Sequence, residues 1–179
     1  MFDAAKERAA RLLGYRPYAR AELIAKLEDV PPEVAAAAVD RLAEVGLQDD
    51  GEVARVYARE RWRVGKWAPG RIRYALVQKG IDEALADATL AELFGEHLGA
   101  DVFEGWGGAR DHDDHGGLDA ELWAAVRRKW RSMPASTPLA ARRRRLLGWL
   151  QRRGFSWDAA ARYARRAEED GGNSTTTLQ

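Results

Sequence analysis

The chain of 179 residues carries 29 basic and 28 acidic side chains, and 46% of its residues are hydrophobic. It contains no cysteine, which excludes disulfides, thiol nucleophiles and cysteine-ligated zinc sites. No apolar run approaches the roughly 18 residues of a membrane span, and the first residues show no secretory signal. We therefore expect a cytoplasmic protein, or an organellar one from which a transit segment has been removed.

Apolar residues at helical spacing, punctuated by glycine and proline, predict an all-α protein. Candidate N-caps are Asp3, Asp49 or Asp50, Asp82 and Ser156. Glycine after the last apolar residue predicts where most of the helices end. The expected helices cover residues 3–14, 19–29, 32–45, 49–65, 69–79, 82–94, 118–133, 138–153 and 156–169.

Two stretches, 76–82 and 150–156, repeat one pattern: an apolar residue, three further residues, glycine, an apolar residue and a helix cap. Each closes a helix that a proline opens, and residues 23–34 follow a shorter version of the same order. The repeat predicts tandem three-helix units, and units of this size stack because each is close to the lower limit for folding alone. The expected domains are 1–47, 48–95 and 118–169, with a flexible Gly/Asp/His-rich insertion at 96–117 and a disordered tail at 170–179.

Charge is unevenly distributed along the chain. Residues 49–80 carry 8 basic and 4 acidic side chains, and residues 127–166 carry 13 and 1. Two basic surfaces suggest a polyanion or an acidic protein face as partner, against the simpler alternative of solvated arginines paired with nearby acids. The candidate binding residues are Arg55, Arg59, Arg63, Lys66, Arg71, Arg73, Lys79, Arg142, Arg143, Arg145, Arg152 and Arg153.

The remaining candidate features give weaker indications. Trp62 and Trp67 flank the basic Gly65-Lys66 turn and could stack on bases, although burial is the favoured interpretation for both.

Metal-ligand residue types cluster at 111–115, but in a glycine-rich loop without a rigid frame, so we predict no metal and no cofactor. The loop could instead be an acidic, hydrated segment that folds back on the basic helices. Phosphate-binding loops, dinucleotide motifs and a framed acid–base pair are missing, so we expect no enzyme.

The middle of the chain resembles the signature of the RecX regulatory proteins. The residues that carry the resemblance are Leu42, Gly46-Leu47, Asp49-Asp50, Tyr57, Arg61, Gly65-Lys66, Pro69, Ile72-Arg73, Leu76 and Gln78-Lys79-Gly80-Ile81-Asp82. The start is similar to that family's opening through Leu12-Leu13, Arg16 and Arg20-Ala21-Glu22-Leu23, and the end through Leu146, Leu150 and Arg152-Arg153-Gly154-Phe155. The resemblance covers roughly residues 4–94 and 118–167.

This resemblance implies tandem three-helix repeats, winged-helix-like without wings, in an elongated curved molecule. It also implies a non-enzymatic monomer that binds the RecA recombinase filament on DNA and usually restrains it, in DNA repair, recombination and the SOS response. The basic residues given above would then contact the filament or single- or double-stranded DNA. The first unit lacks the basic-glycine turn and the insertion is long, so the angles between repeats stay open.

Two other functions remain open at this point. The chain could be a stand-alone DNA-binding protein of helix-turn-helix type, in which the helix at 69–79 or 138–153 enters a groove. It could also be a helical scaffold that binds no nucleic acid. The sequence leaves open whether the recombinase is inhibited or activated, and which basic face meets DNA.

Overall fold

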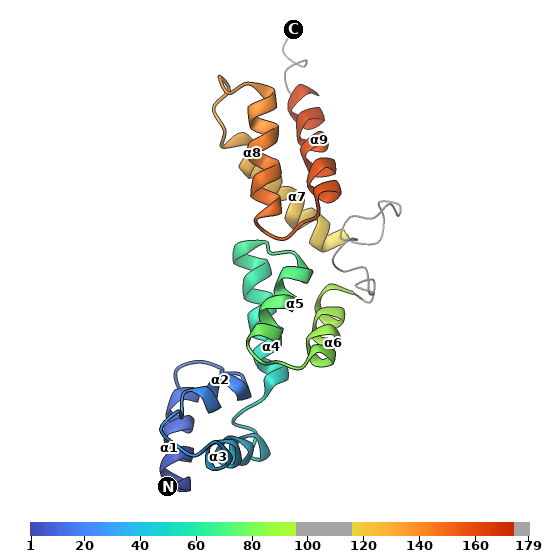
Figure 1. Ribbon diagram of the computed structural model, residues 1–179. Coiled ribbons are helices and arrows are strands. Elements are labelled where there is room, and N and C mark those ends of the chain that lie inside the picture. Colours follow the sequence, from blue (N-terminus) through green and yellow to red (C-terminus); the bar gives the residue numbers. More distant parts are fainter. Residues whose placement is uncertain (96–115, 174–179) are drawn as a thin grey trace. The chain divides into compact units, whose positions relative to one another are not determined.

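The computed structural model describes residues 1–95 and 116–173, and within these ranges it is built from helices without strands (Figure 1). The predicted all-α class is confirmed. Most of the predicted insertion, residues 96–115, and the tail residues 174–179 lie outside the described residues. The elements are α1 (Phe2–Leu13), α2 (Arg20–Ala25), α3 (Pro32–Glu44), α4 (Asp50–Glu60), a π-helical turn (Arg61–Gly65), α5 (Pro69–Gln78), α6 (Glu83–Phe94), α7 (Gly116–Arg131), α8 (Leu139–Gln151) and α9 (Trp157–Asn173).

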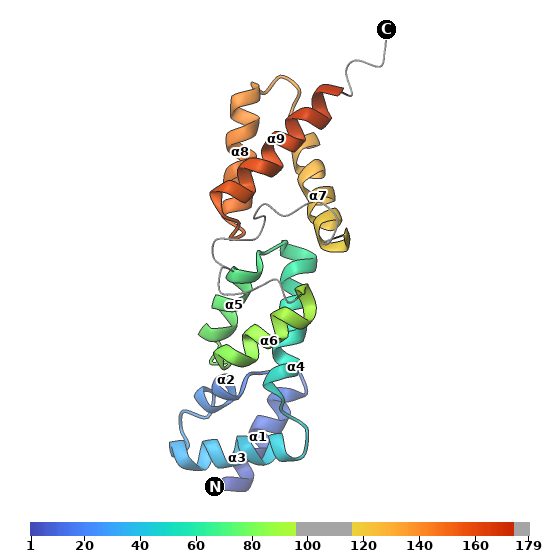
Figure 2. The same ribbon diagram turned by 90° about the vertical axis from the view of Figure 1, so that its right-hand side faces the viewer.

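The described residues form two compact units. The first contains residues 1–61 and 72–95, where α1 and α2 pack on α3, and α4 packs on α6. The second contains residues 62–71 and 116–173, where α8 and α9 lie side by side and both contact α7 (Figure 2). The domain boundaries and the elongated, curved shape inferred from the sequence stay predictions.

Small residues let the helices of the first repeat approach closely. Ala5 and Ala9 of α1 and Ala38 of α3 are buried, and they belong to one apolar cluster with Leu23 and Val39. Alanine on both contacting faces leaves room for the larger side chains of α2 to fill the centre. The first repeat therefore has a core built from alanine contacts around a few leucine and valine side chains.

Three of the predicted helix caps are confirmed. Asp49 accepts a hydrogen bond from the amide of Gly51 at 2.7 Å, and Asp82 accepts from Ala84 at 2.9 Å. The hydroxyl of Ser156 accepts from the amide of Ala159, the third residue of α9, at 3.2 Å. Asp3 does not cap α1, because the helix already begins at Phe2.

Several sequence expectations differ from the structure. The second helix ends at Ala25 rather than near residue 29, because the next amides bond to carbonyls three residues back and the helix gives way to turns. Val56, Val64 and Leu139 lie at apolar helical spacing, which predicts burial, but they are exposed, and 73% of Val64 is accessible. Leucine and valine at helical spacing therefore predict a buried face only where a second helix packs on it.

Two glycine turns pack against the beginning of an earlier helix. Gly80 has φ 79° and Gly154 has φ 91°, so both occupy the left-handed region. A Cβ on Gly80 would lie 2.4 Å from the Cβ of Ala21, and one on Gly154 would lie 2.7 Å from the Cβ of Arg71. Each glycine therefore ends its own helix and lets its turn approach the second helix of the preceding repeat.

We expect Gly80→Ala to destabilise the first unit more than Gly46→Ala. Both glycines have positive φ, but a Cβ on Gly46 would have no atom within 4 Å. Gly46→Ala adds only backbone strain of about 1 kcal/mol, and should lower the thermal unfolding midpoint by about 2–4 °C. Gly80→Ala adds the clash with Ala21 and should lower it by at least about twice as much. Equal shifts would show that the close approach contributes nothing.

Candidate functional site

In the first unit, two predicted basic residues hold the fold together. Arg73 donates to both carboxylate oxygens of Asp87, at 2.5 and 3.0 Å, and to Glu83 at 3.1 Å. These hydrogen bonds raise the pKa of Arg73 and lower that of Asp87. The guanidinium of Arg73 is thus committed to joining α5 to α6, and its charge is already balanced.

Lys79 is engaged in a similar way across the first two repeats. Its ammonium donates to Glu22 at 2.8 Å, and both side chains are about three-quarters buried. Burial alone would raise the pKa of Glu22, but the bond from Lys79 and one from the amide of Ala19 outweigh it and hold that pKa below its ordinary value. Lys79 therefore closes the contact that begins at Gly80 and Ala21.

Arg55, Arg59 and Arg63 are spaced four residues apart, but they do not stay in one helical register. Arg55 is paired with Glu52 at 3.2 Å, whereas Arg59 is exposed, and no carboxylate of the described residues pairs with it. Arg63 lies in the π-helical turn, whose wider winding ends the constant i,i+4 spacing, and belongs to the second unit.

The π-helical turn presents Arg63 and Lys66 in the second unit. Lys66 follows it with φ 51°, a conformation that a side chain other than glycine rarely adopts. Glu121 of α7 accepts from the ammonium of Lys66 at 2.7 Å and from the indole of Trp62 at 3.1 Å. The Lys66 bond holds the pKa of Glu121 below its usual range. One carboxylate thus fastens the strained turn to α7.

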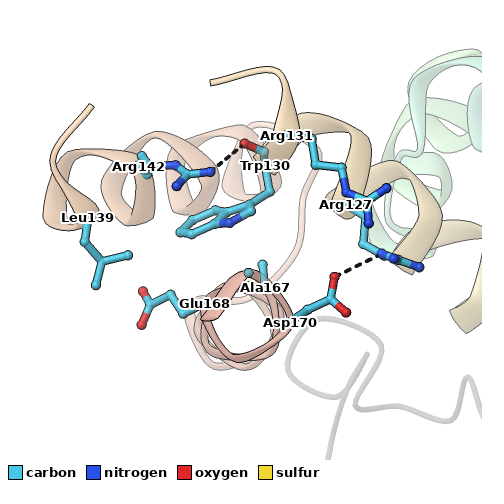
Figure 3. A pocket seen from close by; sticks show the side chains of 9 residues that line it. Arg127, Trp130, Arg131, Leu139, Arg142, Ala167, Glu168 and Asp170 are labelled. Carbon is cyan, nitrogen blue, oxygen red and sulfur yellow. Dashed lines mark hydrogen bonds and ion pairs between the residues drawn. The ribbon is translucent and has the colours of Figure 1, made fainter. Parts of the chain in front are cut away.

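The arginines of α8 divide into engaged and exposed ones. Arg142 stacks on the ring of Trp130 at 4.4 Å and donates to its carbonyl at 3.1 Å (Figure 3). Arg143 contacts Glu168 at 3.6 Å. Arg145 and Arg152 are exposed, with no ion-pair partner within the described ranges.

Arg153 and Arg71 are oriented by tryptophan rings in the second unit. Arg153 stacks on Trp149 at 3.9 Å and donates to its carbonyl at 3.1 Å. Arg71 stacks on Trp67, also at 3.9 Å. Burial, followed by the charges of Arg152 and Arg71, lowers the pKa of the Arg153 guanidinium.

A basic cleft of about 300 Å³ forms between the π-helical turn, α7 and the end of α8. It brings together three predicted residues, Arg63, Lys66 and Arg153, and adds Arg128 and Lys129 of α7. The sequence interpretation missed the last two, although they belong to the same excess of positive charge in residues 127–166. The other lining residues are Val64, Gly65, Ala125, Ser132 and Trp149.

A second depression of about 250 Å³ lies within the third repeat (Figure 3). Arg127 points across it to Asp170, at 3.1 Å, and Trp130 lies between Arg142 and α9. Its lining contains the carboxylates of Glu168 and Asp170 beside its arginines, so it offers less to an anion than the basic cleft does.

Burial of Trp62, at 5% exposure, is confirmed, and Trp67 is half-buried. The histidine and aspartate cluster at 111–115 lies outside the described residues. Across the described ranges, no group of histidine and acidic residues is arranged to hold a metal ion, and no helix is long and apolar enough to cross a membrane.

Comparison with known proteins follows the same three-helix units. Models of the first, second and third three-helix domains of RecX match residues 5–42, 49–90 and 119–163. The regulatory protein RecX of Halorhodospira halophila is 31% identical over 94% of this chain and 91% of its own length. The chain belongs to the RecX family. The RecX of Streptomyces coelicolor is 30% identical over 98% of this chain and 84% of its own length.

Other RecX proteins align over less of their length. In Lactobacillus delbrueckii subsp. bulgaricus, 36% identity covers 51% of this chain and 35% of that protein. Among solved structures, RecX from Lactobacillus salivarius superposes with a TM-score of 0.63 at 18% identity, over 94% of this chain and 97% of that one. A further regulatory protein RecX gives 0.60 at 23% identity, over 94% and 71%. These two structures support the RecX fold.

We expect Glu22→Gln to destabilise the protein by about 1 kcal/mol at pH 7 by removing the charged partner of Lys79. Because the folded-state pKa of Glu22 is lowered, its stabilisation is complete above the unfolded value of about 4.3 and disappears as the pH falls through the folded value. Urea unfolding at pH 7 and near pH 3 should therefore show a difference between variant and parent only at the higher pH.

The exposed pair Arg41–Glu44 provides the matched control for this measurement. Glu44→Gln should change the free energy of unfolding by no more than about 0.5 kcal/mol at either pH, because solvent screens the pair. A Glu22→Gln variant as stable as the parent at pH 7 would show that Lys79 is available to a partner.

Proposed function

We propose that this chain regulates a RecA-type recombinase by binding its filament on DNA and restraining its strand-exchange and ATPase activity. Membership of a family of regulatory proteins along nearly the whole chain is the observation that carries the proposal. No catalytic role is proposed for any residue. We further propose that the protein acts as a monomer in the cytoplasm.

Exposed arginines without an internal partner support a polyanionic or acidic binding surface. Arg59, Arg145 and Arg152 are exposed and outside every ion pair of the described residues. Binding through them would not break a contact within the fold. We propose a smaller set of binding residues than the sequence predicted, because Arg73 and Lys79 already neutralise acids of their own unit.

We expect the triple charge reversal Arg59→Glu, Arg145→Glu and Arg152→Glu to weaken inhibition of strand exchange by at least about tenfold in half-inhibitory concentration. Each reversal replaces attraction to an anionic partner with repulsion. The measurement is a strand-exchange and filament ATPase assay titrated with each protein, together with binding to bare and recombinase-coated DNA.

The matched control reverses three exposed arginines outside the predicted set, Arg11, Arg162 and Arg165. It makes the same change in net charge and should inhibit like the parent. If the parent neither binds the coated DNA nor alters strand exchange, the proposed function is wrong. Strong, sequence-selective binding of the parent to bare duplex alone would indicate a stand-alone DNA-binding protein instead.

A further inference from the structure

The two glycine turns make equivalent contacts, and at the first of them the charge is balanced. Lys79 directly precedes Gly80, and its ammonium meets Glu22, the third residue of α2. The carboxylate of Glu22 also accepts from the amide of Ala19, which precedes α2. This contact between the first and second repeats therefore supplies its own anion.

At the second contact no residue that the structure describes supplies the anion. Arg153 directly precedes Gly154, and the third residue of α5 is Arg71 where α2 has Glu22. The carbonyl of Arg153 accepts from the amide of Ala68 at 2.8 Å, so the backbone takes over the role that the Glu22 carboxylate has at Ala19. The charge of Arg71 acts on Arg153, and no carboxylate of the described residues forms an ion pair with either side chain.

Arg153 keeps an unused hydrogen-bond donor. Its Nε is buried and has no hydrogen-bond partner among the described residues. Its Nη1 donates to the carbonyl of Trp149, and its guanidinium lies over that ring. A half-buried cation with a free donor is costly, and an acceptor with negative charge would offset that cost.

The basic cleft lies beside this group. The described residues that line it include five cationic side chains and no carboxylate. Lys66 is paired with Glu121, whereas no acid in the described ranges comes within 4.0 Å of Arg63, Arg128, Lys129 or Arg153. The volume, about 300 Å³, is at the small end for a ligand site and suits one charged group with its neighbours.

The walls of the cleft are held in place before any ligand binds. Glu121 fastens both Trp62 and Lys66 to α7, on which Arg128 and Lys129 also lie. A Cβ on Gly65 would lie 2.7 Å from the indole of Trp67, so the turn closes tightly on itself. Donors that are already positioned lose less freedom when they bind.

We propose that this cleft binds a backbone phosphate of a nucleic-acid strand, and that the phosphate takes the position of the anion that Glu22 supplies at the first contact. An arginine guanidinium can donate two hydrogen bonds at once to phosphate oxygens. The four cations of the cleft without an acid partner among the described residues match the high charge density of a phosphodiester chain. The cleft offers cations to phosphate oxygens, which are the same at every nucleotide and carry no sequence information.

Binding at the cleft should therefore be sequence-independent and sensitive to salt. This inference rests on the proposed function, because it assigns DNA rather than recombinase to one of the basic surfaces.

The first test compares the parent with Arg63→Gln/Arg128→Gln for binding a fluorescent oligothymidylate over a series of salt concentrations. Both arginines are exposed, so the fold should survive, as circular dichroism can verify. We expect affinity to fall by about tenfold. The slope of log affinity against log salt should decrease in magnitude by about 0.7, the contribution of one phosphate contact on a single strand.

Arg162→Gln/Arg165→Gln removes the same charge from exposed positions of α9 outside the cleft, and should leave the slope unchanged. Equal slopes for the two double variants, or no binding of the oligothymidylate by the parent at low salt, would overturn the proposal. The proposal would also be overturned if Arg63→Gln/Arg128→Gln bound oligothymidylate like the parent but no longer bound polyglutamate. The cleft would then be a site for an acidic protein.

A second variant, Arg71→Glu, tests the missing anion directly. It places a carboxylate at the position equivalent to Glu22, and we expect that carboxylate to pair with Arg153 and reduce oligothymidylate affinity by about tenfold. The control Arg165→Glu makes the same charge change on α9 and should have little effect. If Arg71→Glu folds and binds like Arg165→Glu, the proposal is wrong. Whether the parent inhibits strand exchange is measured separately. The phosphate site and the proposed function can therefore be disproved independently.

Discussion

The contact of a glycine turn with the first turn of an earlier helix is the constraint on which the repeat arrangement depends. At Gly80 and at Gly154 the missing side chain lets the backbone reach the preceding repeat, at Ala21 and at Arg71. No other residue satisfies both the positive φ and the short distance, because a Cβ would overlap the neighbouring atom. Helix termination and repeat-to-repeat packing are thus two results of the same residue.

The two contacts share a backbone geometry and differ in charge. Lys79 and Glu22 neutralise each other at the first, so that contact contributes to stability and is closed to ligands. Arg153 and Arg71 repel each other at the second, and the repulsion adds to burial in lowering the pKa of Arg153. Under the phosphate-binding proposal, this repeat protein keeps one packing geometry and differs between the two contacts in one residue, acidic at the first and basic at the second.

Much of the fold follows from sequence pattern, because helix caps, glycine stops and apolar spacing are local signals. Asp49, Asp82 and Ser156 cap the helices that they were expected to cap. The candidate site was harder to predict, since charge counts do not reveal which arginines already have partners. Arg73 and Lys79 pair with acids that are remote in sequence, whereas Arg128 and Lys129 join Arg63 only when α7 packs beside the π-helical turn. That turn itself leaves no recognisable signature in Arg61–Gly65.

Stacking of arginine on tryptophan has a consequence for the entropy of binding. In the second unit Arg71, Arg142, Arg153 and Arg166 each lie over an indole ring, at 3.9 to 4.4 Å from its centre. A free arginine side chain loses up to about 2 kcal/mol of rotamer freedom when it is immobilised. Here most of that loss accompanies folding, while the edge of the guanidinium keeps its N–H groups. The four tryptophans under these arginines thus do more than apolar packing, because they hold long cationic side chains in a fixed orientation.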